Sequence, residues 1–154
     1  MTKEFMLDTN IFDEVVDGNI KISELQECDA TFYITPIQRA ELKNAGGERA
    51  NKLLDIFNQV SDEERNSILA YDTEGAGYGD GAYASQAQNE IFDKVAEEHA
   101  PGEGEDVNIS TVSISEGITF VTADKRLQNA LERTYPDSYL TREEFIFKLN
   151  NDKI

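Results

Sequence analysis

The sequence predicts an α/β domain with three layers, in which a mainly parallel central sheet lies between two layers of helices. Three observations predict it: short β-rich apolar runs, helical patterns that alternate with these runs, and capping signatures where the helical patterns begin. Strands that alternate with helices favour a parallel sheet covered on both faces. A chain of 154 residues falls in the size range of one domain, so residues 1–154 are expected to form a single unit.

Strands are expected where an apolar run is short and rich in β-branched or aromatic residues. A short last strand is expected at Tyr139 and Leu140, before the final helix. Three longer runs are predicted to be buried strands: residues 4–9 (EFMLDT), 31–35 (TFYIT) and 117–124 (GITFVTAD).

Helices are expected where capping residues precede a helical pattern. Thr35 can cap a helix, Pro36 suits the first helical position and Gln38 completes a capping box, so a helix is predicted from residue 35 to about residue 44. Residues 61–64 and 141–144 carry the same signature and are expected to start helices. The glycine-rich stretches 75–81 and 101–105 are predicted to be mobile loops. Further helices are predicted at 48–60, 62–70, 82–99, 106–116 and 124–134.

Composition narrows the class of protein. No apolar run approaches the roughly 18 residues of a membrane span, and the N-terminus lacks the basic and apolar segments of a secretory signal. Cys28 is the only cysteine and is expected to be a packed thiol, which fits a reducing compartment and excludes a zinc site built from several cysteines. His99, the only histidine, is expected at a helix end. We therefore expect a cytoplasmic protein without a membrane partner.

The charge balance is strongly acidic. The chain has 31 acidic and 14 basic residues, a formal charge of −17, whereas proteins that hold nucleic acid by its phosphates usually present basic patches. The excess of acids can reflect adaptation to high salt, or a site whose carboxylates are neutralised by divalent cations. For most of the acidic residues, solubility alone is a sufficient explanation.

Four acidic residues are predicted to meet at one edge of the sheet. Asp8 and Asp124 each follow a predicted strand, and the carboxyl ends of parallel strands meet at one rim. Asp106 opens one predicted helix and Glu41 lies near the start of another, so both are delivered to the same rim. Taken singly, Asp106 or Asp124 could be only a helix cap, and Asp8 could be only a turn residue. The coincidence of four acids favours a functional site.

Such a cluster of carboxylates calls for a cation. Carboxylates pushed together raise one another's pKa values unless positive charge lies among them. Mg²⁺ and Mn²⁺ prefer oxygen ligands and bridge carboxylates to substrate phosphates, whereas zinc prefers His and Cys ligands, of which the chain has one each. The chemistry that a magnesium or manganese site supports is hydrolysis of a phosphodiester, which indicates a nuclease.

Five segments of the chain carry a resemblance to a known family by their order and spacing. They are L-D-T-N-I-F (7–12), T-P-I-Q-R-A-E-L (35–42), D-V-N-I (106–109) with Gly117 eleven residues after Asp106, F-V-T-A-D-K-R-L (120–127) and Y-L-T-R-E-E-F (139–145). On these segments the chain resembles PIN domains, particularly the VapC-type toxin ribonucleases of bacteria and archaea. The resemblance implies a PIN-like fold and one or two Mg²⁺ or Mn²⁺ ions, held by Asp8, Glu41, Asp106 and Asp124 for the cleavage of RNA. It also implies that Asn10 and Thr122 hold these carboxylates in place, that an antitoxin protein neutralises the nuclease, and that the nuclease is often a homodimer.

Several alternatives remain open in the sequence. The interval from Glu41 to Asp106 is longer than a compact member of this family needs, and a shift of one residue would make Glu105 the ligand in place of Asp106. The domain could instead be a non-catalytic scaffold or binding module, or a nuclease for structured DNA or ribosomal RNA maturation. Candidate contacts to RNA phosphates, each also readable as a solvated surface charge, are Arg39, Lys43, Lys125 and Arg126.

Overall fold

The centre of the molecule is a sheet of five parallel strands. The computed structural model describes residues 3–60, 63–64, 67–69, 81–83, 86–99 and 104–151. In the order β3-β2-β1-β6-β7, the strands are β3 (Glu63–Glu64), β2 (Ala30–Ile34), β1 (Lys3–Leu7), β6 (Thr119–Thr122) and β7 (Tyr139–Thr141), and each pairs with its neighbour in parallel. A separate parallel pair consists of β4 (Ser67–Leu69) and β5 (Gly81–Tyr83). The predicted parallel sheet is confirmed.

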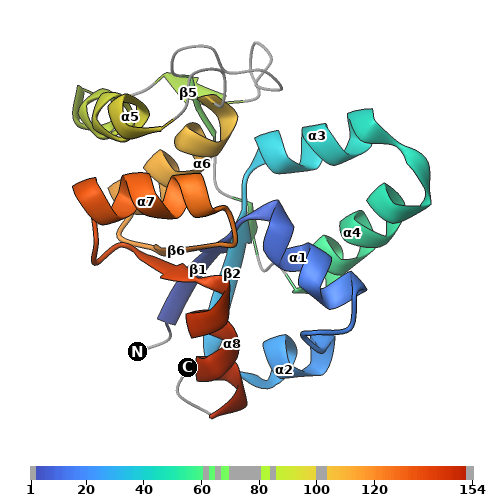
Figure 1. Cartoon of the computed structure of the whole chain (residues 1–154). Helices are drawn as coiled ribbons and strands as arrows, with labels where there is room; N and C mark the ends of the chain where they lie inside the picture. Colours follow the sequence, from blue (N-terminus) through green and yellow to red (C-terminus); the bar gives the residue numbers. More distant parts are fainter. Residues whose placement is uncertain are drawn as a thin grey trace.

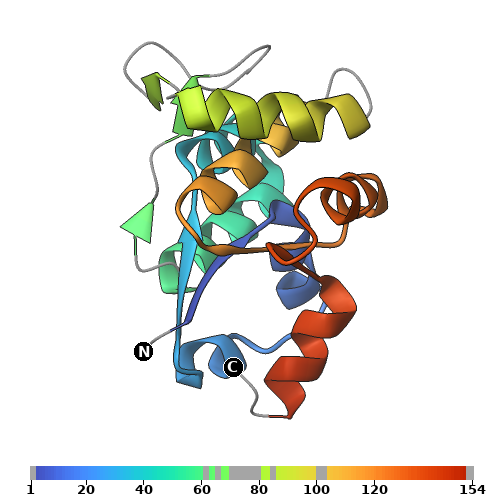
Figure 2. The ribbon, with the colours of Figure 1, turned by 90° about the vertical axis from the view of Figure 1, so that its left-hand side faces the viewer.

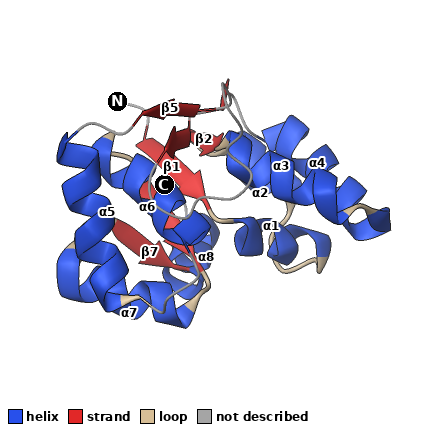
Figure 3. Cartoon of the chain, turned by 90° about the horizontal axis from the view of Figure 1, so that it is seen from above, coloured by secondary structure: helices blue, strands red, loops and turns tan. Residues whose placement is uncertain are grey.

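Helices cover both faces of the central sheet, as the sequence predicted (Figures 1 and 3). One group is α1 (Thr9–Val16), α2 (Ile22–Glu27), α3 (Pro36–Ala45), α4 (Gly47–Val60) and α8 (Arg142–Asn150). The other group is α5 (Gln86–Glu98), α6 (Gly104–Ser115) and α7 (Lys125–Thr134). Within the described ranges, none of these helices has the length and apolar character that crossing a bilayer requires. Figure 2 shows α5, in yellow-green, lying across the top of the molecule.

The core has two buried clusters, one on each face of the central sheet, and successive residues of a strand point into opposite clusters. In β1, Phe5 and Leu7 pack against α1, α2, α4 and α8, whereas Met6 packs against α5, α6 and α7. β6 divides in the same way, with Val121 in the first cluster and Phe120 in the second. Because side chains alternate along a strand, an uninterrupted apolar run is what a sheet buried on both faces requires.

The capping signatures explain where two helices begin. Thr35 Oγ1 accepts a hydrogen bond from the backbone N–H of Gln38, whose side chain accepts one from the backbone N–H of Thr35, with Pro36 at the first helical position. Thr141 and Glu144 form the same reciprocal pair at the start of α8. The predicted starts at Thr35 and Thr141 are therefore confirmed.

The structure corrects the prediction in the middle of the chain. The helix predicted over 62–70 is wrong in the described residues, because Glu63–Glu64 pairs with β2 and Ser67–Leu69 pairs with β5. The helix predicted over 82–99 begins only at Gln86, since residues 81–83 form β5. Most of the loop predicted at 75–81 lies outside the described residues, and so does the first part of the loop predicted at 101–105, whose last two residues begin α6. Strand pairing has overridden the local capping signal at residues 61–64.

Candidate functional site

Asp8 lies where β1 ends and α1 begins, and its side chain is only 6% exposed. Its Oδ1 accepts a hydrogen bond from the backbone N–H of Thr9 at 2.8 Å. Its Oδ2 accepts hydrogen bonds from Thr122 Oγ1 at 2.8 Å and from Asn10 Nδ2 at 3.2 Å. These three hydrogen bonds to the carboxylate favour its charged form. Asn10 and Thr122, predicted to hold a carboxylate in place, both contact Asp8.

The turn after β6 is tied to the end of β1 by the same side chains. Thr122 Oγ1 accepts a hydrogen bond from the backbone N–H of Asp124 at 3.1 Å, and Asn10 Oδ1 accepts one from the backbone N–H of Ala123 at 3.1 Å. Asp124 caps α7, because its Oδ1 accepts from the backbone N–H of Arg126 at 2.9 Å. Two neighbouring parallel strands therefore end at one polar network that contains both predicted acids.

The electrostatics of this rim are set by burial and by neighbouring acids. Burial, together with the negative charge of Asp106, raises the pKa of Asp8 from its ordinary 3.8 to about 7. The hydrogen bonds from Thr122 and Thr9 act in the opposite direction, and Asp124 adds a further, smaller increase. Three of the four predicted acids, Asp8, Asp106 and Asp124, are therefore close enough to interact.

The other acidic candidates are placed less directly. Asp106 is half-buried in the first turn of α6, two residues after the helix begins. Glu41 is half-buried on α3 but is not among the groups that shift the pKa of Asp8. The backbone of Glu105 belongs to α6, and its side chain lies outside the part that the structure describes. Across the described residues, no three acidic, Cys or His side chains form a group that could directly hold a metal ion.

Comparison with known proteins identifies the fold. No protein-family model and no curated protein matches the chain. PAE2754 from Pyrobaculum aerophilum aligns with a TM-score of 0.58 and 15% identity over 98% of this chain and 99% of that one. VapBC2 from Rickettsia felis, solved bound to a DNA fragment from the promoter, aligns with a TM-score of 0.54 and 17% identity. The alignment covers 90% of this chain and 98% of that one. VapBC-1 from nontypeable Haemophilus influenzae aligns with a TM-score of 0.56 and 14% identity. The alignment covers 91% of this chain and 98% of that one.

The chain has a PIN-like fold. The fold class that the sequence predicted is confirmed over nearly the whole chain. Identities of 14–17% establish the fold alone, so the function of this PIN-like domain has to be argued from its own residues.

Two buried glutamines at the same rim were not predicted as site residues. Gln38 Nε2 donates a hydrogen bond to the backbone carbonyl of Leu7 at 2.7 Å, and Gln128 Nε2 donates one to the carbonyl of Thr122 at 2.8 Å. Sequence reasoning assigned Gln38 only to a capping box and gave Gln128 no role. A signal for Gln128 exists, because this polar residue interrupts the buried apolar stripe of α7.

The basic residues proposed to contact RNA lie on helices that begin near the rim. Arg39 is half-buried and donates a hydrogen bond through Nη1 to Asn58 Oδ1 at 3.1 Å, whereas Lys43 is exposed in the last turn of α3. Lys125 and Arg126 are exposed at the start of α7. The arrangement places basic side chains on two of the helices that carry the acids, and contact with RNA stays a prediction.

The two remaining titratable candidates are structural. His99 is buried immediately after α5, as expected of a residue at a helix end. Cys28 is half-buried after α2, and its Sγ donates to the carbonyl of Leu25 at 3.2 Å. Burial raises the pKa of the Cys28 thiol, which is the environment of a packed and unreactive cysteine.

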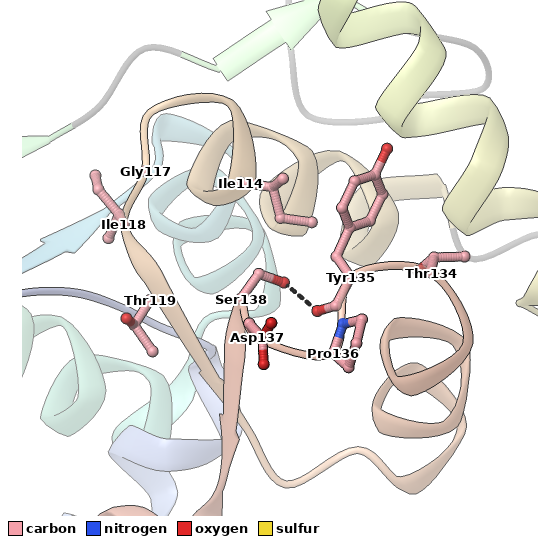
Figure 4. Close-up of a pocket in the computed structure, with 9 residues that line it drawn as sticks. All are labelled: Ile114, Gly117, Ile118, Thr119, Thr134, Tyr135, Pro136, Asp137 and Ser138. Carbon is pink, nitrogen blue, oxygen red and sulfur yellow. Dashed lines mark hydrogen bonds between the residues drawn. The ribbon is translucent and has the colours of Figure 1, made fainter.

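A hollow of about 410 Å³ lies at the opposite end of β6 from the acids. Figure 4 shows its lining, in which Ser138 Oγ donates a hydrogen bond to the carbonyl of Tyr135 at 2.6 Å. The lining residues come from the ends of α6 and α7 and from the starts of β6 and β7. The hollow is therefore separate from the carboxylate rim of the PIN-like fold.

Proposed function

We propose that this PIN-like domain is a metal-dependent endoribonuclease that hydrolyses phosphodiester bonds of RNA. The observation that carries the proposal is the position of Asp8, a buried carboxylate at the carboxyl ends of two parallel strands, held by hydrogen-bond donors and influenced by Asp106 and Asp124. Burying acids together is costly unless a cation compensates their charge. A strongly perturbed carboxylate in such a place is a typical feature of an active site.

The donor chemistry of the rim fits Mg²⁺ or Mn²⁺. Hard divalent cations prefer carboxylate oxygens, and Mg²⁺ in particular keeps several water ligands and contacts only one or two carboxylates directly. The described acids do not form a group of three direct ligands, which is compatible with an ion held partly through water. In the proposal Asp8 and Asp106 hold the ion, directly or through water, with Glu41 added from α3. Such an ion activates a water molecule and stabilises charge on the phosphate.

The protein's own residues position and neutralise this site. Asn10 and Thr122 fix Asp8 Oδ2, and Thr122 also fixes the backbone N–H of Asp124. Both capping hydrogen bonds of Asp124 go to Oδ1, so its second oxygen can serve a ligand without loss of the helix cap. In the proposal Asp8 is the central metal ligand and Asp124 either holds a second ion or orients the attacking water.

The proposal extends to RNA binding and to a protein partner. A chain with a formal charge of −17 has to hold phosphates through local basic residues, and we assign this role to Arg39, Lys43, Lys125 and Arg126. Two of the similar structures are VapBC assemblies, and on this likeness we infer that the domain is the toxin of a toxin–antitoxin pair. A homodimer is part of the same inference.

A non-catalytic PIN-like binding module is the competing function. It is favoured by one observation, namely that the described acids do not form a closed metal-binding group. The two functions differ in one measurable property, because only the nuclease cleaves RNA in a manner that depends on a divalent cation.

The test compares RNA cleavage by the wild-type chain and two matched variants in the presence of Mn²⁺. Asp8→Asn removes the central carboxylate, and we expect it to lower cleavage roughly 100-fold or more, since even residues that only support metal ligands cost 10–100-fold. Asp13→Asn is the control, because Asp13 lies on the helix that Asp8 caps but pairs with Arg49 at 2.8 Å. No Mn²⁺-dependent cleavage by the wild type, or equal cleavage by Asp8→Asn, would reject the nuclease in favour of the binding module.

A further inference from the structure

Two glutamines occupy equivalent places at the ends of the two central strands. Gln38 is completely buried in the first turn of α3, and Gln128 is 7% exposed one turn into α7. Each donates its side-chain amide to the backbone carbonyl of a residue at the end of a strand. Neither glutamine is charged, and in each case the bonded carbonyl lies next to the carboxylate network.

Gln38 fixes the peptide that carries Asp8. Its Nε2 donates to the carbonyl of Leu7 at 2.7 Å, and the N–H of the same peptide, which belongs to Asp8, donates to the carbonyl of Val121 at 2.9 Å. Leu7 lies one residue beyond the last register pair between β1 and β2, Met6 with Tyr33. The glutamine amide therefore supplies a hydrogen bond to β1 at a point where the register pairs with β2 have ended.

Gln128 fixes the next strand in the same way. Its Nε2 donates to the carbonyl of Thr122 at 2.8 Å, and the N–H of that peptide, which belongs to Ala123, donates to Asn10 Oδ1 at 3.1 Å. The hydroxyl of Thr122 in turn donates to Asp8 Oδ2. In both the Leu7–Asp8 and the Thr122–Ala123 peptide, a glutamine thus donates to the carbonyl. The N–H of the first peptide donates to β6, and the N–H of the second donates to Asn10 on α1.

We propose that Gln38 and Gln128 are a matched pair of positioning residues, which hold Asp8 and Thr122 in the geometry for metal binding without contacting metal or substrate themselves. This inference rests on the proposed metal-dependent function. The physical reason is that a buried carbonyl without a donor is costly, so loss of either amide forces the strand end to shift. Residues that support metal ligands in this indirect way typically contribute 10–100-fold to metal affinity.

The test replaces each glutamine by methionine, which keeps the length of the side chain but removes the amide. The affinity for Mn²⁺ alone is measured by electron paramagnetic resonance, with the full chain at neutral pH. We expect the dissociation constant for Mn²⁺ to rise roughly 10–100-fold in Gln38→Met and in Gln128→Met. If Gln38→Met does not fold, Gln38→Glu replaces it, because glutamate keeps the acceptor of the capping box but lacks the Nε2 donor.

The control is Thr141→Ala, which weakens the matching capping box at the start of α8 by removing the hydrogen bond from the backbone N–H of Glu144 to Thr141 Oγ1. It is expected to cost about 1 kcal/mol of stability and to leave the Mn²⁺ affinity unchanged. Equal Mn²⁺ affinity in the wild type and in both glutamine variants would overturn the positioning role and leave the glutamines as purely structural groups.

A second measurement separates this inference from the proposed function. Hydrogen exchange of the Asp8 and Ala123 amides reports the two tethered peptides directly and needs no metal. We expect faster exchange at these amides in the glutamine variants than in Thr141→Ala. If the wild type binds no Mn²⁺, the proposed function fails, and unchanged exchange at both amides would reject the positioning role independently.

Discussion

The two ends of β6 differ in what they offer to a ligand. At the carboxyl end, Thr122 and Asp124 join a buried polar network around Asp8, whose pKa is raised to about 7. At the amino end, a hollow of about 410 Å³ lies between Ile114, Tyr135 and Pro136. The hollow thus lies at the end of β6 whose lining mixes apolar residues with polar ones such as Asp137 and Ser138, whereas the buried carboxylate with the raised pKa lies at the other end. Because perturbed pKa values cluster at functional sites, the buried charge at the carboxyl end of β6 favours that end over the hollow as the candidate site.

The difference follows from the direction of the helices in a parallel α/β fold. Helix N-termini lie at the carboxyl end of the strands and favour negative charge, because their backbone N–H groups point toward the rim. Asp8 and Asp124 each occupy an N-cap there, and Asp106 lies in the first turn of α6. At the other end, α6 finishes where the N–H groups of Gly117 and Ile118 cap its carbonyls. A capping role and a functional role for these acids are therefore compatible.

The largest difference between the two ends of β6 is expected when one acid at each end is neutralised. Asn caps a helix as well as Asp does, so Asp124→Asn is expected to keep the stability of α7 while losing the charge at the rim. We expect RNA cleavage in the presence of Mn²⁺ to fall roughly 100-fold. Cleavage rates and thermal unfolding of the same preparation provide the measurement.

The matched variant at the hollow is Asp137→Asn, which also exchanges an aspartate for its amide. Asp137 is exposed and lies at the amino end of the strands, so cleavage is expected to stay at the wild-type rate. A loss of cleavage in Asp137→Asn equal to that in Asp124→Asn would show that the hollow takes part in the reaction and would end the distinction between the two regions.

A smaller effect is expected on the pH dependence of stability. Because the folded pKa of Asp8 is about 7 and its ordinary value is 3.8, the folded chain binds more protons than the unfolded chain between these values. The free energy of unfolding of the metal-free wild type is therefore expected to fall as pH rises from about 4 to about 7. The rise in pKa corresponds to at most roughly 4 kcal/mol.

Asp8→Asn removes this titration. The variant is expected to be more stable than the wild type at pH 8, because it carries no charge that has to be buried. The amide cannot accept all the hydrogen bonds that the Asp8 carboxylate accepts, so we expect the gain to be about half of the maximum of roughly 4 kcal/mol, or roughly 2 kcal/mol. The difference should vanish near pH 4. Urea unfolding in the presence of a chelator, at both pH values, measures it. If the wild type instead became more stable relative to the variant as the pH rises, the raised pKa of Asp8 would be contradicted.

The sequence predicted where Asp8 and Asp124 lie better than it predicted the elements in the middle of the chain. The positions of Asp8 and Asp124 were predictable because each residue follows an apolar strand, and the carboxyl ends of parallel strands lie at the same edge of the sheet. The predicted helix over 62–70 failed at Glu63–Glu64, because a two-residue edge strand is decided by pairing with β2 and leaves no periodic pattern. The short helices α1 and α2 were also missed, although Ile11 and Phe12 begin an apolar stripe after Asp8.

The hydrogen bond by which Gln38 holds the end of β1 was beyond what the sequence could predict. Gln38 reaches the carbonyl of Leu7, 31 residues away in the chain, so this contact depends on the docking of α3 against β1, whereas Gln128 reaches Thr122 only six residues away. The position of Glu41 has the same origin, since it lies one turn beyond Gln38 on α3. Local patterns predict which residues end strands and cap helices, whereas long-range packing decides how those residues are held.

The smallest expected effect tests whether the two ends of α6 are independent. Gly117 has a φ of +70° and closes the helix, with its N–H donating to the carbonyl of Ile114 at 3.1 Å. A Cβ at this position would meet nothing within 4 Å, so Gly117→Ala carries only the conformational cost of a left-handed residue, about 1 kcal/mol.

For a chain of this size, that cost lowers the unfolding temperature by roughly 2–4 °C, which differential scanning calorimetry can detect. RNA cleavage is expected to be unchanged, because Asp106 lies at the opposite end of α6 and the hydrogen bonds of Asp8 involve neither end of that helix. If Gly117→Ala reduced cleavage while the chain remained folded, the substitution at the C-terminal end of α6 would have changed the position of Asp106 at its N-terminal end. The two ends of β6 would then have to be treated as one coupled site.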